Sequence, residues 1–220
     1  ALGLSGVTPA LVEYLIGLFN SSIVPVVPEV GSVGASGDLA PLAQLGAVLL
    51  GHGAAFHFEG GRQAERRLKK PYRFRPKEAL SLINGFQFTA AVLAETLVGA
   101  EQVLKLADVA AAMSLEALKG SLKPFDARVQ RARPHPGQER VAANFRSLLR
   151  ASEVRASPRN CKKVQDAYCL RCIPQVHGAV RDAFDHARGV LLREVNSATD
   201  NPLGFENGDI VSAGNFHGQP

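Results

Sequence analysis

A helical pattern of more than thirty residues, from about Phe86 to Lys119, places the strongest constraint on the fold of this chain. At 1.5 Å per residue, a helix of that length spans about 50 Å. A second long helical region runs from about Cys161 to Val195, with Pro174 inside it as a kink or a break. Helices this long need partners along their length. The pattern predicts a mainly α protein, an extended long-helix bundle that we expect to continue across subunits.

Shorter elements are expected before the first long helix. Thr8 and Pro9 form an N-cap and first-turn pair, which predicts a helix up to Asn20. The alternation over residues 54–59, followed by two glycines, predicts a small β-hairpin. No internal repeat or low-complexity linker separates these elements. We therefore expect residues 1–220 to form one piece without an independent domain boundary.

Positive charge is concentrated in one segment. The chain has a formal net charge of +5, and eight Lys or Arg face the single Glu65 between residues 62 and 77. This basic run is short, bounded by Pro71 and Pro76, and outside any recognition motif. We interpret it as a solvated connector and expect no nucleic-acid partner.

The segment Gly34-Ala35-Ser36-Gly37-Asp38 contains a triplet with unusual chemical potential. If the Gly37 nitrogen attacks the Ala35 carbonyl and two waters leave, one of them taking the Ser36 hydroxyl, a methylideneimidazolone (MIO) results. Glycine is favoured in the third position because the missing Cβ allows the close backbone approach that cyclisation needs. The MIO group is an electrophile, and no natural side chain is a good electrophile.

The same segment also fits an ordinary junction between a loop and a helix. In that interpretation Asp38 or Ser36 N-caps a helix from about Leu39 to Leu50, and Gly37 supplies the turn. The two interpretations are compatible, so the function has to be decided by other parts of the chain.

Three further segments resolve the question. They are SLINGFQ at 81–87, VQDAYCLRCIPQVHG at 164–178, and NSATDNPL at 196–203 with GNFHG at 214–218. Together with GSVGASGDLAPLAQLG at 31–46, they resemble the aromatic amino acid ammonia-lyase family, and its histidine branch in particular. The resemblance covers essentially the whole chain. It implies the fumarase/aspartase-like bundle of long helices, with a small hairpin and an active-site loop region.

The resemblance implies a role for each site residue. Ala35, Ser36 and Gly37 would form the MIO group, with Ser36 supplying the reactive carbon, and no metal is expected. Tyr168 would act near this group. The residues implied to bind substrate or line its pocket are Asn84, Gln165, Arg171 and Phe216.

Residue chemistry supports part of this assignment. A guanidinium fork such as that of Arg171 binds a carboxylate bidentately and stays charged at any working pH. Gln165, Tyr168 and Arg171 recur every third residue, so on a helix they share one face. Each residue also has an ordinary interpretation: an ion-paired Arg171, an amphipathic face, an Asn-Gly turn at Asn84, and core packing for Phe216.

His217 and Phe86 lie close in sequence to residues that the resemblance assigns to the site. His217 lies beside Phe216, but adjacent residues point in different directions, and the family places the aromatic residue in the pocket. We assign His217 no catalytic role. Family members of the histidine branch usually carry a small hydroxyl residue where this chain has Phe86, so the chain departs from the family at this position.

Cys169 and Cys172 form a CxxC motif, with Cys161 and His177 near it. Structural zinc sites usually have two tight ligand pairs in a small domain, whereas one tight pair lies here in a helical pattern. No βαβ pattern surrounds the motif, as a thioredoxin-like dithiol would require. We expect three reduced cysteines, as is typical of a cytoplasmic protein.

The resemblance implies an enzyme that eliminates ammonia from L-histidine to give urocanate in histidine catabolism, as a cytoplasmic homotetramer with shared active sites. A phenylalanine or tyrosine ammonia-lyase, or an aminomutase, is the alternative within the enzyme class. A non-catalytic helical assembly module is the alternative from another class. The family's tyrosine base and ring-recognising residues have no counterpart in the chain, so we expect an internal fragment that is inactive alone.

Overall fold

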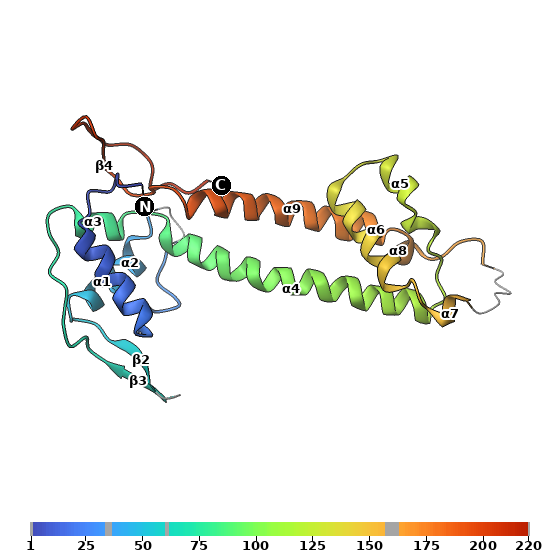
Figure 1. The fold of residues 1–220 in the computed structure, drawn as a ribbon, viewed down its shortest axis with the longest axis horizontal. Coiled ribbons are helices and arrows are strands. Elements are labelled where there is room, and N and C mark those ends of the chain that lie inside the picture. Colours follow the sequence, from blue (N-terminus) through green and yellow to red (C-terminus); the bar gives the residue numbers. More distant parts are fainter. Residues whose placement is uncertain (1, 34–36, 60–61, 157–162, 220) are drawn as a thin grey trace. The chain divides into compact units, whose positions relative to one another are not determined.

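The computed structural model describes residues 2–33, 37–59, 62–156 and 163–219, and it is mainly helical (Figure 1). The chain forms two compact units, one of residues 1–93 with 190–220 and one of residues 94–189. The division falls inside two long helices, α4 (Gln87–Ala117) and α9 (Ile173–Glu194). No linker marks this division in the sequence, because a helix continues through it.

The first unit combines short helices with a small sheet. Its elements, besides the beginning of α4 and the end of α9, are α1 (Pro9–Asn20), β1 (Ile23–Pro25), α2 (Leu39–Leu49), β2 (Ala55–Glu59), β3 (Arg62–Arg66), α3 (Glu78–Ile83), β4 (Leu203–Gly204) and β5 (Ile210–Val211). The predicted α1 and hairpin are confirmed. The basic connector is only partly a connector, because its first five residues form β3.

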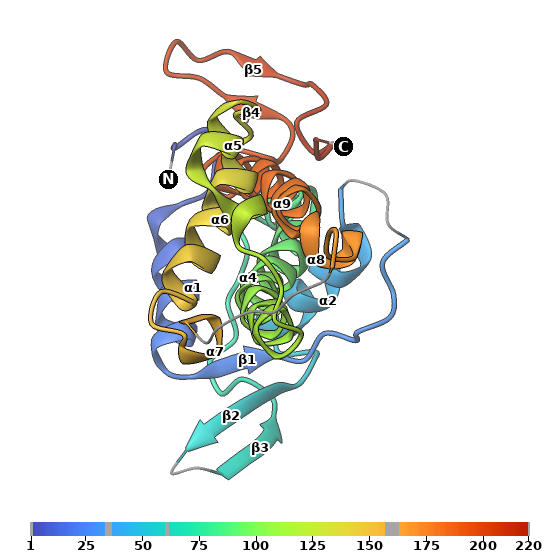
Figure 2. The same ribbon diagram turned by 90° about the vertical axis from the view of Figure 1, so that its right-hand side faces the viewer.

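The sheet of the first unit has the antiparallel order β1-β2-β3. Figure 2 shows β1 beside the β2–β3 hairpin. Pro25 ends β1, at the edge of the sheet, where a residue without an N–H is tolerated. Val48, Leu49, Ala55 and Leu68 form the buried core that α2 and the sheet share.

The second unit is built around aromatic packing. Besides its parts of α4 and α9, it contains the 3₁₀ helix η1 (Lys123–Phe125), α5 (Ala127–Arg131), α6 (Pro136–Leu148), α7 (Glu153–Ala156) and α8 (Tyr168–Arg171). Phe125 and Phe145 are fully buried, and their rings stack with centroids 4.6 Å apart. Leu115 of α4 and Ile173 of α9 belong to the same core.

The predicted start of the second helical region needs correction, because residues 163–167 are not helical. The second helical region is interrupted at Cys172, between α8 and α9, and Pro174 lies in the first turn of α9, where its missing N–H breaks no helical hydrogen bond. Cys161 lies outside the described residues. After the end of α4, Lys119 adopts a left-handed conformation, with φ at 48°.

The packing at the end of α4 favours glycine at position 120. Its N–H donates to the Leu115 carbonyl at 2.7 Å, which closes the end of α4. A Cβ added to Gly120 would lie 2.3 Å from Leu115 Cδ1. Close packing, rather than a left-handed backbone, therefore favours glycine at this position.

A buried carboxylate joins the first residues of α1 and α3. Glu78 is fully buried, and it accepts hydrogen bonds from the Thr8 hydroxyl at 2.5 Å, Thr8 N–H at 3.1 Å and Arg75 N–H at 2.7 Å, with the Tyr72 hydroxyl at 3.2 Å. Burial alone would raise the pKa of Glu78, but these hydrogen bonds to the charged form outweigh burial and hold the pKa below its ordinary value. The folded state therefore favours the ionised carboxylate.

Replacing Glu78 by Gln should destabilise the fold by about 1–3 kcal/mol at pH 7, because an amide NH₂ would face hydrogen-bond donors. Because the folded-state pKa is the lower one, the wild-type advantage is present above about pH 4.3 and is lost as the pH falls through the folded-state value. Urea unfolding at several pH values measures this difference. Glu65→Gln on exposed β3 is the control, and equal stability of Glu78→Gln and wild type at pH 7 would contradict the assignment.

Candidate active site

Gly37 is the described member of the Ala-Ser-Gly triplet, since Ala35 and Ser36 lie outside the described residues. Its φ of +79° is in the left-handed region that favours glycine. A Cβ built on Gly37 would lie 3.2 Å from Asn84 Oδ1 and 3.5 Å from Phe216 Cδ2. Three residues from distant parts of the sequence thus meet in the first unit, all of which the sequence predicts to be site residues.

Asn84 occupies this position because α3 ends there. It is the C-cap residue of α3, and its N–H donates to the Leu80 carbonyl at 2.9 Å. The carbonyl of the following Gly85 accepts from Asp38 N–H at 3.0 Å. The Asn-Gly pair therefore ends a helix and also places its amide beside Gly37, so the ordinary and the functional interpretation of Asn84 both apply.

Asp38 is the N-cap residue of α2, as expected, but its side chain caps a different helix. It makes no side-chain hydrogen bond to α2. The carboxylate, only 2% exposed, accepts from Thr89 N–H at 2.8 Å and contacts the Thr89 hydroxyl at 2.8 and 3.0 Å. Thr89 N–H is one of the first amides of α4, which have no partner inside the helix. The carboxylate also interacts favourably with the positive end of the α4 dipole.

The Phe86 side chain packs beside the GNFHG segment at residues 214–218. Its side chain is buried, and a Cβ on Gly218 would lie 2.1 Å from Phe86 Cε2, so the ring lies directly against the Gly218 backbone. Phe86 N–H also donates to the Thr199 hydroxyl at 3.3 Å. The large residue at this position is thus accommodated by packing against glycine. His217 is exposed, with Nδ1 2.8 Å from the Gly218 carbonyl.

The remaining predicted residues belong to the second unit. Gln165 and Arg171 line a cavity of about 670 Å³, and Tyr168 is the first residue of α8 and is 70% exposed. Gln165 precedes α8 and lies in a bend, so the expectation that all three share one helix face is wrong for Gln165. Only Tyr168 and Arg171 belong to the same helical turn.

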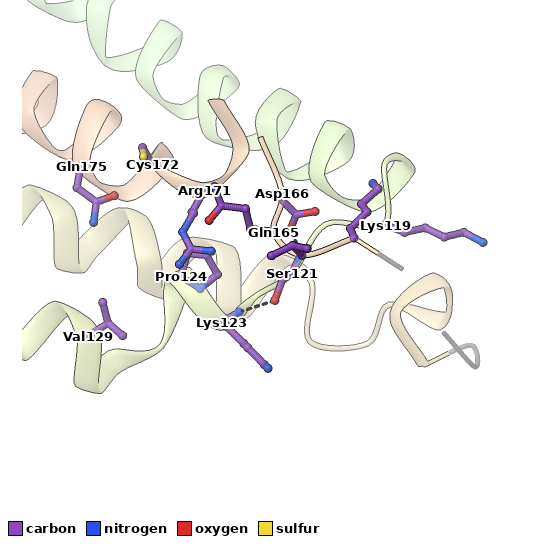
Figure 3. A pocket seen from close by; sticks show the side chains of 12 residues that line it. Lys119, Ser121, Lys123, Pro124, Val129, Gln165, Asp166, Arg171, Cys172 and Gln175 are labelled. Atoms are coloured by element: carbon purple, nitrogen blue, oxygen red, sulfur yellow. Dashed lines mark hydrogen bonds between the residues drawn. The ribbon is translucent and has the colours of Figure 1, made fainter. Parts of the chain in front are cut away.

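Positive charge dominates this cavity. The Lys, Arg, Asp and Glu side chains that line it are Lys119, Lys123, Lys163, Arg171 and Asp166. Asp166 accepts a hydrogen bond from Ser121 N–H at 2.6 Å. Figure 3 shows the Arg171 side chain near that of Gln165 and the Lys123 side chain pointing away from Arg171. The cavity also contains Gln175, whose buried Oε1 has no hydrogen-bond partner among the described residues.

Among the residues that the structure describes, no group of three or more His, Cys, Asp and Glu side chains could hold a metal ion. His177 is one of the four candidate zinc ligands in the sequence. Its Nδ1 lies 2.9 Å from Asp108 Oδ1. Cys161, another of the four, is not among the described residues. The sequence did not reveal the partners of Asp38, Phe86 or His177, because all three involve residues distant in the chain.

The fold is that of known ammonia-lyase and aminomutase structures. Histidine ammonia-lyase from Trypanosoma cruzi superposes with a TM-score of 0.85 at 39% identity, covering 99% of this chain and 41% of that one. Tyrosine aminomutase from Streptomyces globisporus gives a TM-score of 0.85 at 37% identity, covering 98% of this chain and 45% of that one. The predicted fold class is confirmed.

The chain belongs to the aromatic amino acid lyase family, whose model matches residues 1–220. Among curated relatives, histidine ammonia-lyase from Anaeromyxobacter dehalogenans (strain 2CP-C) is 52% identical over 234 residues, covering 100% of this chain and 46% of the relative. The chain thus spans about half the length of the curated relatives it matches. The family resemblance is confirmed.

Asp38→Ala should destabilise the protein by about 1–3 kcal/mol, because the first turn of α4 loses its cap and a buried amide loses its acceptor. Thr89→Val removes the hydroxyl alone and should cost less. Urea unfolding of both single variants and the double variant tests the contact. A double variant less destabilised than the sum supports it, and strict additivity would place the two residues in independent roles.

Proposed function

We propose that this chain is part of an ammonia-lyase that converts L-histidine to urocanate and ammonia. The observation that carries the proposal is the arrangement of Gly37, in a left-handed conformation directly after Ala35-Ser36, with Asn84 and Phe216 against it. Family membership and the identity to relatives named histidine ammonia-lyase support it. Cytoplasmic localisation and a role in histidine catabolism belong to the same proposal.

An MIO group fits the residues present. Gly37 has the conformation and the close neighbours that make a Cβ costly, and ring closure favours a third residue without one. The group would supply an electrophilic carbon, derived from Ser36, that a substrate can bond. Asn84 would hydrogen-bond this region, which its Oδ1 lies beside, and the Phe216 ring would form an apolar wall next to it.

Arg171 would hold the substrate carboxylate. Its guanidinium lies in a cavity with excess positive charge, and no hydrogen bond from it to another described residue competes for the fork. Gln165 would line the same cavity, and Tyr168 would act close to the reacting atoms. Arginine suits this role because it presents two parallel donors to one carboxylate.

The two long helices favour assembly with further copies of the chain. Within the second unit, the exposed positions Gly99, Val103, Leu106, Ala110 and Met113 of α4 recur at alternating spacings of four and three residues. This is the spacing of a coiled-coil seam. We propose that this α4 seam is covered in a homotetramer with shared active sites.

A lipid bilayer is a less suitable environment for the α4 seam than another copy of the chain. By length and composition alone, the stretch Glu78–Ala117 is apolar enough to cross a bilayer. However, it includes Glu95, Glu101, Lys105 and Asp108, and a charged side chain at the bilayer centre costs about 2.5–3.5 kcal/mol. Lys105 and Glu101 also form an exposed ion pair at 2.9 Å, which fits a wet surface.

A subunit of full family length containing this chain should weigh less than its sequence by two waters, localised to the peptide with residues 35–37. Ser36→Ala should abolish the mass loss and most turnover, because no hydroxyl can be eliminated. Intact-mass spectrometry measures this, with Ser32→Ala as the neighbouring control that keeps the loss. An unmodified mass in the wild type would remove the electrophile from the proposal.

Arg171→Lys in that subunit should lower kcat/KM by about one order of magnitude or more, since the charge remains but the bidentate fork is lost. Steady-state kinetics with L-histidine, L-phenylalanine and L-tyrosine measure this and the substrate preference together. Arg128→Lys, at an exposed ion pair with Asp126, is the control. Unchanged kinetics would place Arg171 outside the site, and faster release of cinnamate than urocanate would favour the phenylalanine alternative.

Leu106→Glu should shift the subunit toward smaller assemblies, because it places a charge in the proposed α4 seam. Light scattering after size-exclusion chromatography measures the mass in solution. Ile210→Glu, at an exposed position in the first unit, is the matched control. An unchanged assembly in Leu106→Glu would show that the seam is not an interface.

A further inference from the structure

The function proposed above leaves the CxxC motif unexplained. Cys169 and Cys172 are both free thiols, with Cys169 exposed and Cys172 partly buried. They lie on either side of Leu170-Arg171, in the turn that α8 forms. Any change in the geometry of this turn therefore reaches Arg171 directly.

The helical backbone of this turn sets the spacing of the two cysteine Cα atoms. Arg171 N–H donates to the Ala167 carbonyl at 3.0 Å, and Cys172 N–H donates to the Tyr168 carbonyl at 2.8 Å, so the backbone is helical up to Cys172. In a helix, Cα atoms three residues apart are about 5 Å from each other, within the range of about 4.4–6.8 Å found in disulfides. The backbone thus meets the first requirement of a disulfide.

The side chains require a further adjustment. Cβ atoms three residues apart on a helix are about 5–6 Å from each other, whereas a disulfide needs about 3.5–4.5 Å. Closing the bond would tighten this turn by about 1–2 Å. The unit that would have to shift is short, because α8 has only four residues and the helix is interrupted at Cys172 before α9. Arg171 lies inside the segment that would move.

We propose that Cys169 and Cys172 form a reversible dithiol–disulfide pair whose oxidation displaces Arg171 and weakens substrate binding. The kinetic part of this inference rests on the proposed function of Arg171. The disulfide itself does not. Disulfides of cytosolic proteins are usually transient and redox-sensing, which fits a pair that is reduced at rest.

The reaction balances with a low-molecular-weight disulfide as oxidant. The exposed Cys169 thiolate attacks one sulfur of oxidised glutathione, forms a mixed disulfide and releases one glutathione thiol. Cys172 then attacks Cys169 Sγ, which closes the intramolecular bond and releases the second thiol. The protein loses two electrons and two protons, and one oxidised glutathione becomes two reduced ones.

The test uses the full-length subunit with Cys161→Ser, so that the pair is isolated from the third cysteine. After equilibration with oxidised glutathione, intact mass should fall by two hydrogens, localised to the peptide with residues 168–172. The KM for L-histidine should rise about tenfold or more, since a displacement of about 1 Å in a positioning group can cost up to about a hundredfold. Dithiothreitol should reverse both changes.

Two variants define the mechanism. Cys169→Ser should keep the kinetics of the reduced enzyme and lose the response to oxidised glutathione. Cys172→Ala should trap one glutathionyl group on Cys169, because the resolving thiol is missing. A trapped adduct on any other residue would overturn the assignment of Cys169 as the attacking thiol.

The outcomes separate this inference from the proposed function. If no intramolecular disulfide forms, the inference fails while the lyase activity can still be present. If the disulfide forms but KM is unchanged in an active enzyme, the coupling to Arg171 is overturned. If the disulfide forms in a protein without lyase activity, the proposed function fails and the redox pair stands.

Discussion

The hydrogen bonds between Asp38 and Thr89 are the contact on which the proposed site depends. A buried carboxylate is costly unless its oxygens are satisfied, and here the first turn of α4 supplies the donors. The same contact fixes the backbone that follows Gly37 against the beginning of α4. Because Asn84 and Gly85 directly precede that helix, their position relative to Gly37 is fixed as well. One carboxylate thus caps a helix and also holds the backbone that follows Gly37.

A second buried carboxylate has the corresponding role in the other unit. Asp108 of α4 accepts from Arg181 Nη2 of α9 at 2.7 Å and from Asn144 Nδ2 of α6 at 2.8 Å, and His177 Nδ1 lies 2.9 Å away. Asp108 is 3% exposed, so loss of the Arg181 guanidinium would remove the permanent positive charge beside this buried carboxylate. This network holds three helices together just beyond the turn that carries Arg171.

Much of the fold could be predicted from local patterns. The long helix of α4, the start of α1 at Thr8-Pro9 and the hairpin after residue 54 follow from periodicity, capping and glycine placement, which act over a few residues. The errors occurred where local signals compete. The helical pattern suggested a start near Cys161, but residues 163–167 are not helical; Pro174 suggested a kink or a break, and the chain breaks at Cys172 and uses the proline in a new first turn. Gln165 had the right spacing for a helix face and yet precedes the helix.

The sequence by itself determined the helical class, the family and the chemistry that Ala-Ser-Gly and Arg171 make possible, because these depend on residue types and on short spacings. Only the tertiary structure decided that Asp38 caps α4 rather than α2, that Phe86 packs on Gly218, and that Asn84 and Phe216 meet at Gly37. The physical reason is that such contacts join residues far apart in the chain. Their formation is selected by packing and by the need to satisfy buried polar groups, and no local pattern encodes either.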